Sequence, residues 1–345
     1  TGTSSIQDTF YHSTDPGVEY INWTGSNHSQ LFVLLFQDPE KYARYHMFKN
    51  EGAEYIAGLP EQRDLWLGRV SRQMSKAGRK TMLFSGEDIS SPQFDAAAER
   101  MHGFFKERSD DVSAFGYARP PKGFIESSFQ QNLRGGIVFD FADRKPRPNY
   151  RRRFEKIFRI FGPENVTIKE FSQARLWQGD VVKDFARHLG IAAPKETEIR
   201  TSNESLSLEA TALLYVQRRF GKGFVSGFAN ALSANNRFVA TLSGIGERRL
   251  AFSNEMVAPL LTVIEEDVAW MEDKLGHAFS DPKDLQDSAI CSVEDLMEVA
   301  LQCYDEVLET AGMSHSNAGP ASLANLVAVI EAVREQSYAV QAPAR

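Results

Sequence analysis

The first residues that could do chemistry stand at the start of the printed sequence, Thr1-Gly2-Thr3-Ser4-Ser5. This run combines hydroxyl side chains with one glycine and leads into residues that favour a helix. Backbone N–H groups at a helix N-terminus, together with nearby hydroxyl groups, bind anions such as phosphate. The run therefore predicts a phosphate-binding loop, and an ordinary helix cap is the alternative interpretation.

A second anion signal joins Arg119 to Ser127, which stands eight residues later. Arg119 follows a strand-like run, residues 112–117, and Ser127 lies in the first turns of the helix-like run after it. Ligands in open α/β sheets bind at the carboxyl ends of strands. A guanidinium offers two parallel donors to a phosphate and a hydroxyl adds another. The pair predicts a second phosphate site, and a surface arginine with a capping serine is the alternative.

Glu87 and His28 are the candidate general bases. Glu87 follows a short apolar run, residues 81–85, which reads as a buried strand, and His28 follows the β-prone run 18–23. A carboxylate or a histidine can take a proton from a reacting hydroxyl, and histidine titrates near neutral pH. Glu87 is preferred because its position after a strand is cleaner. Each residue could instead be an ordinary loop residue.

A basic run covers residues 144–153, where six of ten residues are Lys or Arg in a chain of net charge −7. Arg144, Arg147 and Arg151 are the candidates for binding an anionic acceptor. Cations at a helix N-terminus oppose the helix dipole, which favours a binding role over a purely structural one. A solvated helix start is the alternative interpretation.

The elements that must position these residues alternate between strand-like and helix-like runs through the first half of the chain. This alternation predicts an α/β fold with a parallel sheet flanked by helices. From residue 206 onward the periodicity is mainly helical. We expect strands near residues 18–23, 81–85, 112–117 and 165–171, and C-terminal helices at 208–220, 254–275, 293–310 and 323–338.

Length and composition limit the classes of protein. At about 150 residues per domain, 345 residues predict one or two domains, here an α/β domain at 1–215 and a helical extension at 216–345. The 42% hydrophobic and 25% charged composition excludes a disordered chain. A net charge of −7 argues against a nucleic-acid partner. No apolar run approaches the roughly 18 residues of a membrane span.

Cysteine and histidine usage argue against a metal centre. The two cysteines, Cys291 and Cys303, are too few for a disulfide framework or a cysteine zinc site, and the seven histidines are scattered. We therefore expect no metal and a reducing, cytoplasmic location. The P-loop pattern GxxxxGK[ST] is also absent.

The two phosphate signals together resemble the signatures of the bacterial sulfotransferase family, which uses 3′-phosphoadenosine 5′-phosphosulfate (PAPS). In that family a strand enters a Lys-Thr-Gly-Thr-[ST]-[ST] loop, and an Arg is followed eight residues later by a Ser. Residues 1–5 match the loop from its second position, and Arg119 with Ser127 match the second signature. The resemblance covers residues 1–215, with further similarity at Asn27-His28-Ser29 and around 161–166 and 176–191.

The resemblance implies an enzyme that moves the sulfuryl group from PAPS to a hydroxyl, most readily one on a carbohydrate or polysaccharide. Thr1 to Ser5 would hold the 5′-phosphosulfate, and Arg119 with Ser127 the 3′-phosphate. Glu87 or His28 would be the base, and adenosine 3′,5′-bisphosphate (PAP) the product. The fold implied is a five-stranded parallel sheet. The loop lysine and first strand of the family have no counterpart in the sequence, so we expect them upstream of Thr1.

Two other functions fit parts of the sequence. A P-loop kinase-like phosphotransferase is one, because Ile137-Val138-Phe139-Asp140 resembles a strand that ends in a magnesium-binding aspartate. A non-catalytic protein of sulfotransferase fold, with its helical half as a partner surface, is the other. The amphipathic C-terminal helices leave open whether the chain forms a homo-oligomer.

Overall fold

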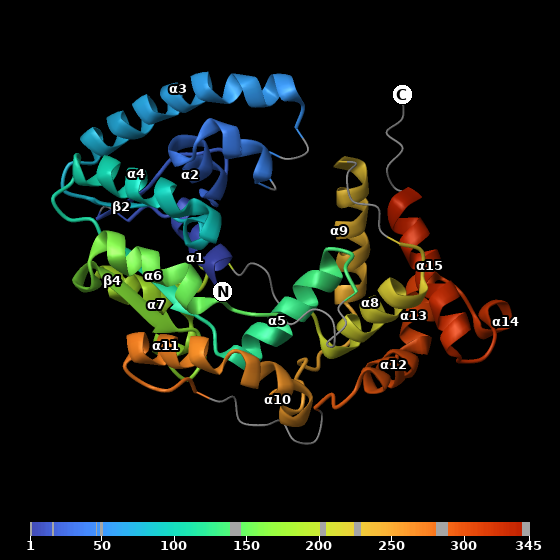
Figure 1. The fold of residues 1–345 in the computed structure, drawn as a ribbon. Helices are drawn as coiled ribbons and strands as arrows, with labels where there is room; N and C mark the ends of the chain where they lie inside the picture. The colour runs from blue at the N-terminus through green and yellow to red at the C-terminus, as the bar shows by residue number, and fades with distance from the viewer. Residues whose placement is uncertain are drawn as a thin grey trace. The chain divides into compact units, whose positions relative to one another are not determined.

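The computed structural model of this chain describes residues 2–15, 17–45, 47–48, 51–138, 146–200, 205–223, 229–280 and 289–339. The fold is α/β, with many helices and small parallel sheets (Figure 1). The chain divides into two compact units that alternate along the sequence. Unit 1 comprises Thr1–Pro120, Asn149–Glu204 and Glu266–Ser280, and unit 2 comprises Pro121–Pro148, Ser205–Glu265 and Asp281–Arg345. A functional boundary at residue 215 stays a prediction.

Unit 1 contains the four strands at the predicted places. β1 (Val18–Tyr20) pairs in parallel with β2 (Thr81–Leu83), and β3 (Ala114–Ala118) pairs in parallel with β4 (Val166–Glu170). Each strand is followed by a helical segment, as parallel pairing requires. The parallel α/β interpretation is confirmed at this level.

The sheet differs from the expected single sheet, because the described strands form two separate pairs. The Thr81 N–H donates to Gly17 O and the Leu83 carbonyl accepts from Ile21, so the backbone of Met82 between them faces the opposite edge of β2. Likewise the Ala118 carbonyl accepts from the N–H of Phe171, directly after β4, which turns the backbone of Tyr117 to the opposite edge of β3. Among described residues, no further strand pairs with either edge.

Helices cover both faces of the β3–β4 pair. α6 (Tyr150–Phe161) contacts both strands, and α7 (Val181–Leu189) packs its Phe185 ring on Phe115 of β3, with the ring centres 5.3 Å apart. The remaining helices of unit 1 are α1 (Thr3–Tyr11), α2 (Ser29–Phe36), α3 (Ala53–Ala77), α4 (Asp95–Lys106) and most of α11 (Glu265–Leu275).

One cluster of buried side chains ties the two strand pairs together. Ile6 and Phe10 of α1 pack with Val18 and Leu83 from the first pair, and with Val182 of α7. Tyr117 and Phe171, from the second pair, pack against the same cluster. Because apolar burial is the main stabilising force, α1 joins both strand pairs in one structure.

Helix α2 is followed by a separate short helix and does not continue as one long helix. α2 ends at Phe36, and Pro39–Arg44 forms a separate 3-10 helix with Pro39 at its start. Proline lacks the N–H that a continuing α-helix needs, so it starts a new segment instead. α3 then begins at Ala53 and runs for 25 residues.

Unit 2 is built around one buried helix, α8 (Leu208–Phe220). Ser207 caps it, because its Oγ accepts from the Ala210 N–H at 2.9 Å. Residues 208–217 are buried on all sides, as expected for a helix in the middle of a core. Its packing partners are α5 (Pro121–Arg134), α9 (Ala229–Ser243), α12 (Val293–Gln302) and α15 (Leu323–Ala339).

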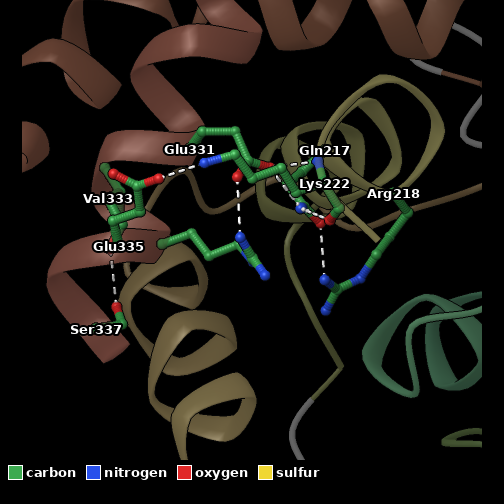
Figure 2. Close-up of polar contacts among 8 residues, drawn as sticks. Gln217, Arg218, Lys222, Glu331, Val333, Glu335 and Ser337 are labelled. Atoms are coloured by element: carbon green, nitrogen blue, oxygen red, sulfur yellow. Dashed lines mark hydrogen bonds and ion pairs between the residues drawn. The ribbon is translucent and has the colours of Figure 1, made fainter. Parts of the chain in front are cut away.

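A polar cluster joins α8 to α15 within this unit (Figure 2). Glu331 accepts from the Gln217 amide at 2.8 Å and from the Lys222 N–H at 2.9 Å. Arg218 donates to the Gln217 Oε1 at 2.7 Å. Burial lowers the pKa of the Arg218 guanidinium to about 10, which leaves it charged at neutral pH. These bonds satisfy polar groups that burial would otherwise penalise.

Two long C-terminal helices of the prediction are each divided in the structure. Residues 254–275 form α10 (Asn254–Val263) and α11, because Leu260 joins the core of unit 2 whereas Met271 joins a core of unit 1. Residues 293–310 form α12 and α13 (Tyr304–Ala311), which contact α8 and α15 respectively. The short α14 (His315–Ala318) precedes α15.

Candidate functional site

Gly2 is fixed at the start of α1 by its backbone and its surroundings. It has φ +64°, and its carbonyl accepts the Ile6 N–H at 3.2 Å. A Cβ at this position would lie 2.5 Å from the Phe171 ring, so only glycine fits. Gly2 of the predicted loop therefore lies against Phe171, the residue that follows β4, and Thr3 and Ser4 begin α1. Ser5 is buried in the first turn of α1, and Thr1 lies outside the described residues.

Arg119 lies against the same phenylalanine. It follows β3 directly, and its guanidinium carbon is 5.0 Å from the centre of the Phe171 ring. The Tyr150 hydroxyl donates to the Arg119 carbonyl, which holds the backbone at this point. The structure thus brings the start of α1 and Arg119 to one ring at the carboxyl end of the β3–β4 pair. Open α/β sheets bind ligands at such ends.

Ser127 lies on α5 and is half-buried. It belongs to unit 2, whereas Arg119 belongs to unit 1, with the division falling between Pro120 and Pro121. The pairing of Ser127 with Arg119 around one phosphate stays a prediction.

Glu87 is exposed on a turn that follows β2 and docks on the start of α2. The Asp88 N–H donates to Ser29 Oγ at 3.3 Å. A Cβ on Gly86 would lie 2.7 Å from the Ser29 nitrogen, so the close approach requires glycine. Gln7 of α1 donates from its amide to Ser85 in the same turn, at 3.3 Å to the carbonyl. The turn that carries Glu87 is therefore bonded to the helix that begins at the predicted loop.

His28 is fully buried, with both ring nitrogens in hydrogen bonds. Nδ1 accepts from the Ser85 N–H at 3.1 Å, so Nε2 carries the proton and donates to the Ile21 carbonyl at 3.1 Å. Burial lowers the pKa of His28 to about 4, which keeps the ring neutral. These contacts hold the ends of β1 and β2 together and use the lone pair that a general base needs.

The basic run is divided by the structure. Arg147 is exposed and belongs to unit 2, Arg151 is exposed in the first turn of α6 in unit 1, and Arg144 lies outside the described residues. Arg151 pairs with Glu155 at 3.0 Å. Asp267 accepts the Arg151 backbone N–H at 2.8 Å, which places an acidic group at the helix start and offsets the adverse arginine charges.

Sequence reasoning missed two residues of α6 that reach the segment after Glu87. Arg153 donates to Ser90 Oγ at 3.2 Å, and the Lys156 ammonium donates to the Ser91 carbonyl. Burial lowers the pKa of Lys156 to about 8. Residues three apart lie on one face of a helix, so the spacing of Arg153 and Lys156 could have indicated from the sequence that they act together.

Sequence analysis also missed Phe171, because no sequence motif marked it.

Asp184 is buried on α7 and accepts from the Tyr117 hydroxyl at 2.8 Å and the Lys169 ammonium at 2.9 Å. Burial would raise the Asp184 pKa, but hydrogen bonds from Lys169, Tyr117 and the Trp177 N–H hold it below its usual value. Asp184 thus anchors β3 and β4 to α7 and steadies the sheet edge that carries Phe171.

Neither a metal centre nor a membrane span is visible in the part of the chain that the structure describes. No group of three or more His, Cys, Asp or Glu side chains there is placed to hold a metal ion. No helix there is both long and apolar enough to cross a bilayer. Comparison with known protein families, with curated proteins and with solved structures finds no match for this chain.

Proposed function

We propose that this protein is a sulfotransferase that moves the sulfuryl group of PAPS to a hydroxyl of a carbohydrate acceptor. The observation that carries the proposal is the shared contact with Phe171. Both the start of α1 and the Arg119 guanidinium lie against this ring, at the carboxyl end of a parallel strand pair. N–H groups at a helix start and a guanidinium are two of the best phosphate-binding groups in proteins.

The strand arrangement gives a second line of support. The resemblance expects a strand that leads directly into Thr1. β2 and β3 each have an edge without a partner strand among the described residues, and α1 packs against both pairs. A strand entering α1 could pair with both edges and join them as one five-stranded sheet.

The transfer step follows from the groups at this edge. The acceptor oxygen attacks sulfur, its proton passes to a base, and the bond between sulfur and the phosphate oxygen breaks to release PAP. The N–H groups of α1 would stabilise negative charge on the departing 5′-phosphate. Arg119 would bind the 3′-phosphate, and Ser127 is proposed as its partner from the resemblance alone.

Glu87 is the better of the two proposed bases. It is exposed, and its turn is bonded to α1 through Gln7 and Ser85. His28 is enclosed with both nitrogens occupied, so it would have to break a buried hydrogen bond to accept a proton. Arg153, bonded to Ser90 in the same segment, adds a cation close to this turn.

Calorimetric titration of the full-length protein with PAP tests the proposal. We expect micromolar binding, and a roughly ten- to hundredfold loss in Arg119→Ala, because a charge-assisted contact contributes about 1.5–3 kcal/mol. Arg79→Ala, which removes an exposed arginine after α3, should bind PAP like the wild type. AMP, which lacks the 3′-phosphate, should bind far more weakly and lose little in Arg119→Ala.

Absence of PAP binding to the wild type would refute the sulfotransferase proposal. Binding of Mg-ATP in its place would favour the kinase-like alternative. That alternative relied on Asp140, which lies outside the described residues. A third outcome, PAP binding that Arg119→Ala leaves unchanged, would place the nucleotide elsewhere on the protein.

A further inference from the structure

Unit 1 contains a cavity of about 230 Å³ that has no role in the transfer step described above. It is formed by the segment after β1, by α2, by Phe48 and by α3. Its lining includes Trp23, Gln30, Phe48, Tyr55, Gln62 and Trp66.

The cavity has an apolar floor and a more polar rim. Phe48 is buried at 1% exposure and Trp23 at 9%, whereas Tyr55 is 39% exposed and Gln62 is also open to solvent. The Trp23 and Trp66 rings pack edge to face with centres 4.4 Å apart. Aromatic rings that pair an apolar face with a polar edge suit ligands that are apolar on one side and hydroxylated on another.

Two side-chain amides at this cavity have no hydrogen-bond partner among the described residues. Gln30 lies in the first turn of α2 and Gln62 on α3, and both line the cavity. An amide offers an acceptor oxygen and two N–H donors, which matches a hydroxyl group that donates and accepts. The lining residues themselves are uncharged, which suits a neutral ligand, and the Arg69 guanidinium lies against the Trp66 ring, 4.5 Å from its centre.

Helix α2 carries both a residue of the cavity lining and the residue that bonds to the turn of Glu87. Gln30 follows Ser29, whose Oγ accepts the Asp88 N–H at 3.3 Å and whose nitrogen is approached closely by Gly86. The start of α2 thus connects the cavity to the segment that would supply the base. Ligand sites commonly combine an apolar lining with a few polar groups in this way.

We propose that this cavity binds one neutral sugar ring of the acceptor, with Trp66 against the C–H face of the ring and Gln30 and Gln62 on its hydroxyls. As an acceptor site it rests on the proposed function. Its volume is below the about 300–1,000 Å³ of pockets that enclose drug-sized ligands, so it takes a single ring of a longer chain.

Tryptophan fluorescence titration of the full-length protein tests this assignment. The probes are the methyl glycosides of glucose, galactose and N-acetylglucosamine, with 2-naphthol as an aryl probe. We expect saturable millimolar binding of at least one glycoside, weakened about three- to tenfold in Gln62→Ala by the loss of one hydrogen bond. Trp66→Ala should weaken it further. Gln131→Ala, an exposed glutamine in unit 2, is the matched control.

PAP affinity is measured on the same samples, so the two proposals fail separately. Glycoside binding without PAP binding would keep the sugar site and remove its role as an acceptor site for sulfuryl transfer. Binding of 2-naphthol alone, or glycoside binding that Gln62→Ala leaves unchanged, would overturn the sugar assignment. Because Gln62 is exposed, its variant tests the site even if Trp66→Ala fails to fold.

Discussion

His28 links its own protonation to the stability of unit 1. Its pKa is about 4 in the folded protein and about 6.5 when exposed, so the unfolded chain binds more protons between these values. Stability from this group is fully present above about pH 6.5 and is lost as the pH falls towards 4. The shift corresponds to about 3 kcal/mol at most.

We predict that His28→Gln lowers stability at pH 7.5, because buried hydrogen bonds to Ser85 and Ile21 are lost or altered. Its urea-unfolding free energy should also fall less steeply than that of the wild type between pH 6.5 and 4.5. Subtracting the two curves removes the contributions of His102 and His188, whose pKa values burial also lowers. His12→Gln replaces an exposed histidine and serves as the control, so its unfolding free energy should depend on pH as that of the wild type does. Equal slopes of unfolding free energy against pH for the wild type and His28→Gln would contradict the prediction.

Residue types could be predicted from the sequence better than residue surroundings. Gly2 and Arg119 were marked by their motifs, and the structure places both against Phe171. His28 was marked by its type and its place after a strand. Its full burial depends on contacts with Ile21 and Ser85, and Ser85 is 57 residues away in sequence. Such distant contacts leave no local pattern, so the sequence could not separate a buried structural histidine from a base.

At the scale of elements, α7 begins at a well-defined cap. Asp180 precedes the helix, and its Oδ1 accepts from the N–H groups of Val182 and Lys183, each at 2.8 Å. A carboxylate here satisfies two donors that the helix cannot pair and interacts favourably with the helix dipole. Because α7 carries Asp184, the cap supports the sheet edge next to the proposed site.

We predict that Asp180→Ala destabilises unit 1 by about 0.5–2 kcal/mol in urea unfolding followed by tryptophan fluorescence. Asp180→Asn should recover most of the loss, since an amide oxygen also accepts from backbone N–H groups. Asp64→Ala, which removes an exposed aspartate on α3, serves as control. Equal unfolding free energies for Asp180→Ala and Asp64→Ala would show that the cap does not stabilise unit 1.

The elements themselves were predictable where local pattern decides them. Apolar runs predicted the four strands, and the helical periodicity of the sequence predicted α8 over the same residues as in the structure. The pattern could not show the break at Ile264, because the two helices are equally helical in sequence and differ only in the core that each joins. Nor could it show how strands pair, because pairing joins residues such as Val18 and Thr81 that lie far apart.

At the scale of the whole molecule, the two compact units have separate buried cores. Every side chain in the large core around α8 belongs to unit 2, and the other three buried clusters belong to unit 1. A unit with its own core can unfold as its own cooperative step. The sequence suggested two parts, but it could not show that each unit is assembled from three separate stretches of chain.

The four tryptophans allow the units to be followed separately, since residues 23, 66, 177 and 270 all lie in unit 1. Leu213 of α8 and Leu31 of α2 are both fully buried, one in each unit, and Leu→Ala at such sites costs about 2–5 kcal/mol. We predict that Leu213→Ala shifts the urea transition seen by far-ultraviolet circular dichroism while the fluorescence transition stays in place. Leu31→Ala should shift the fluorescence transition. If Leu213→Ala moved both transitions together, the units would unfold as one, and stability measured by fluorescence would then report the whole chain.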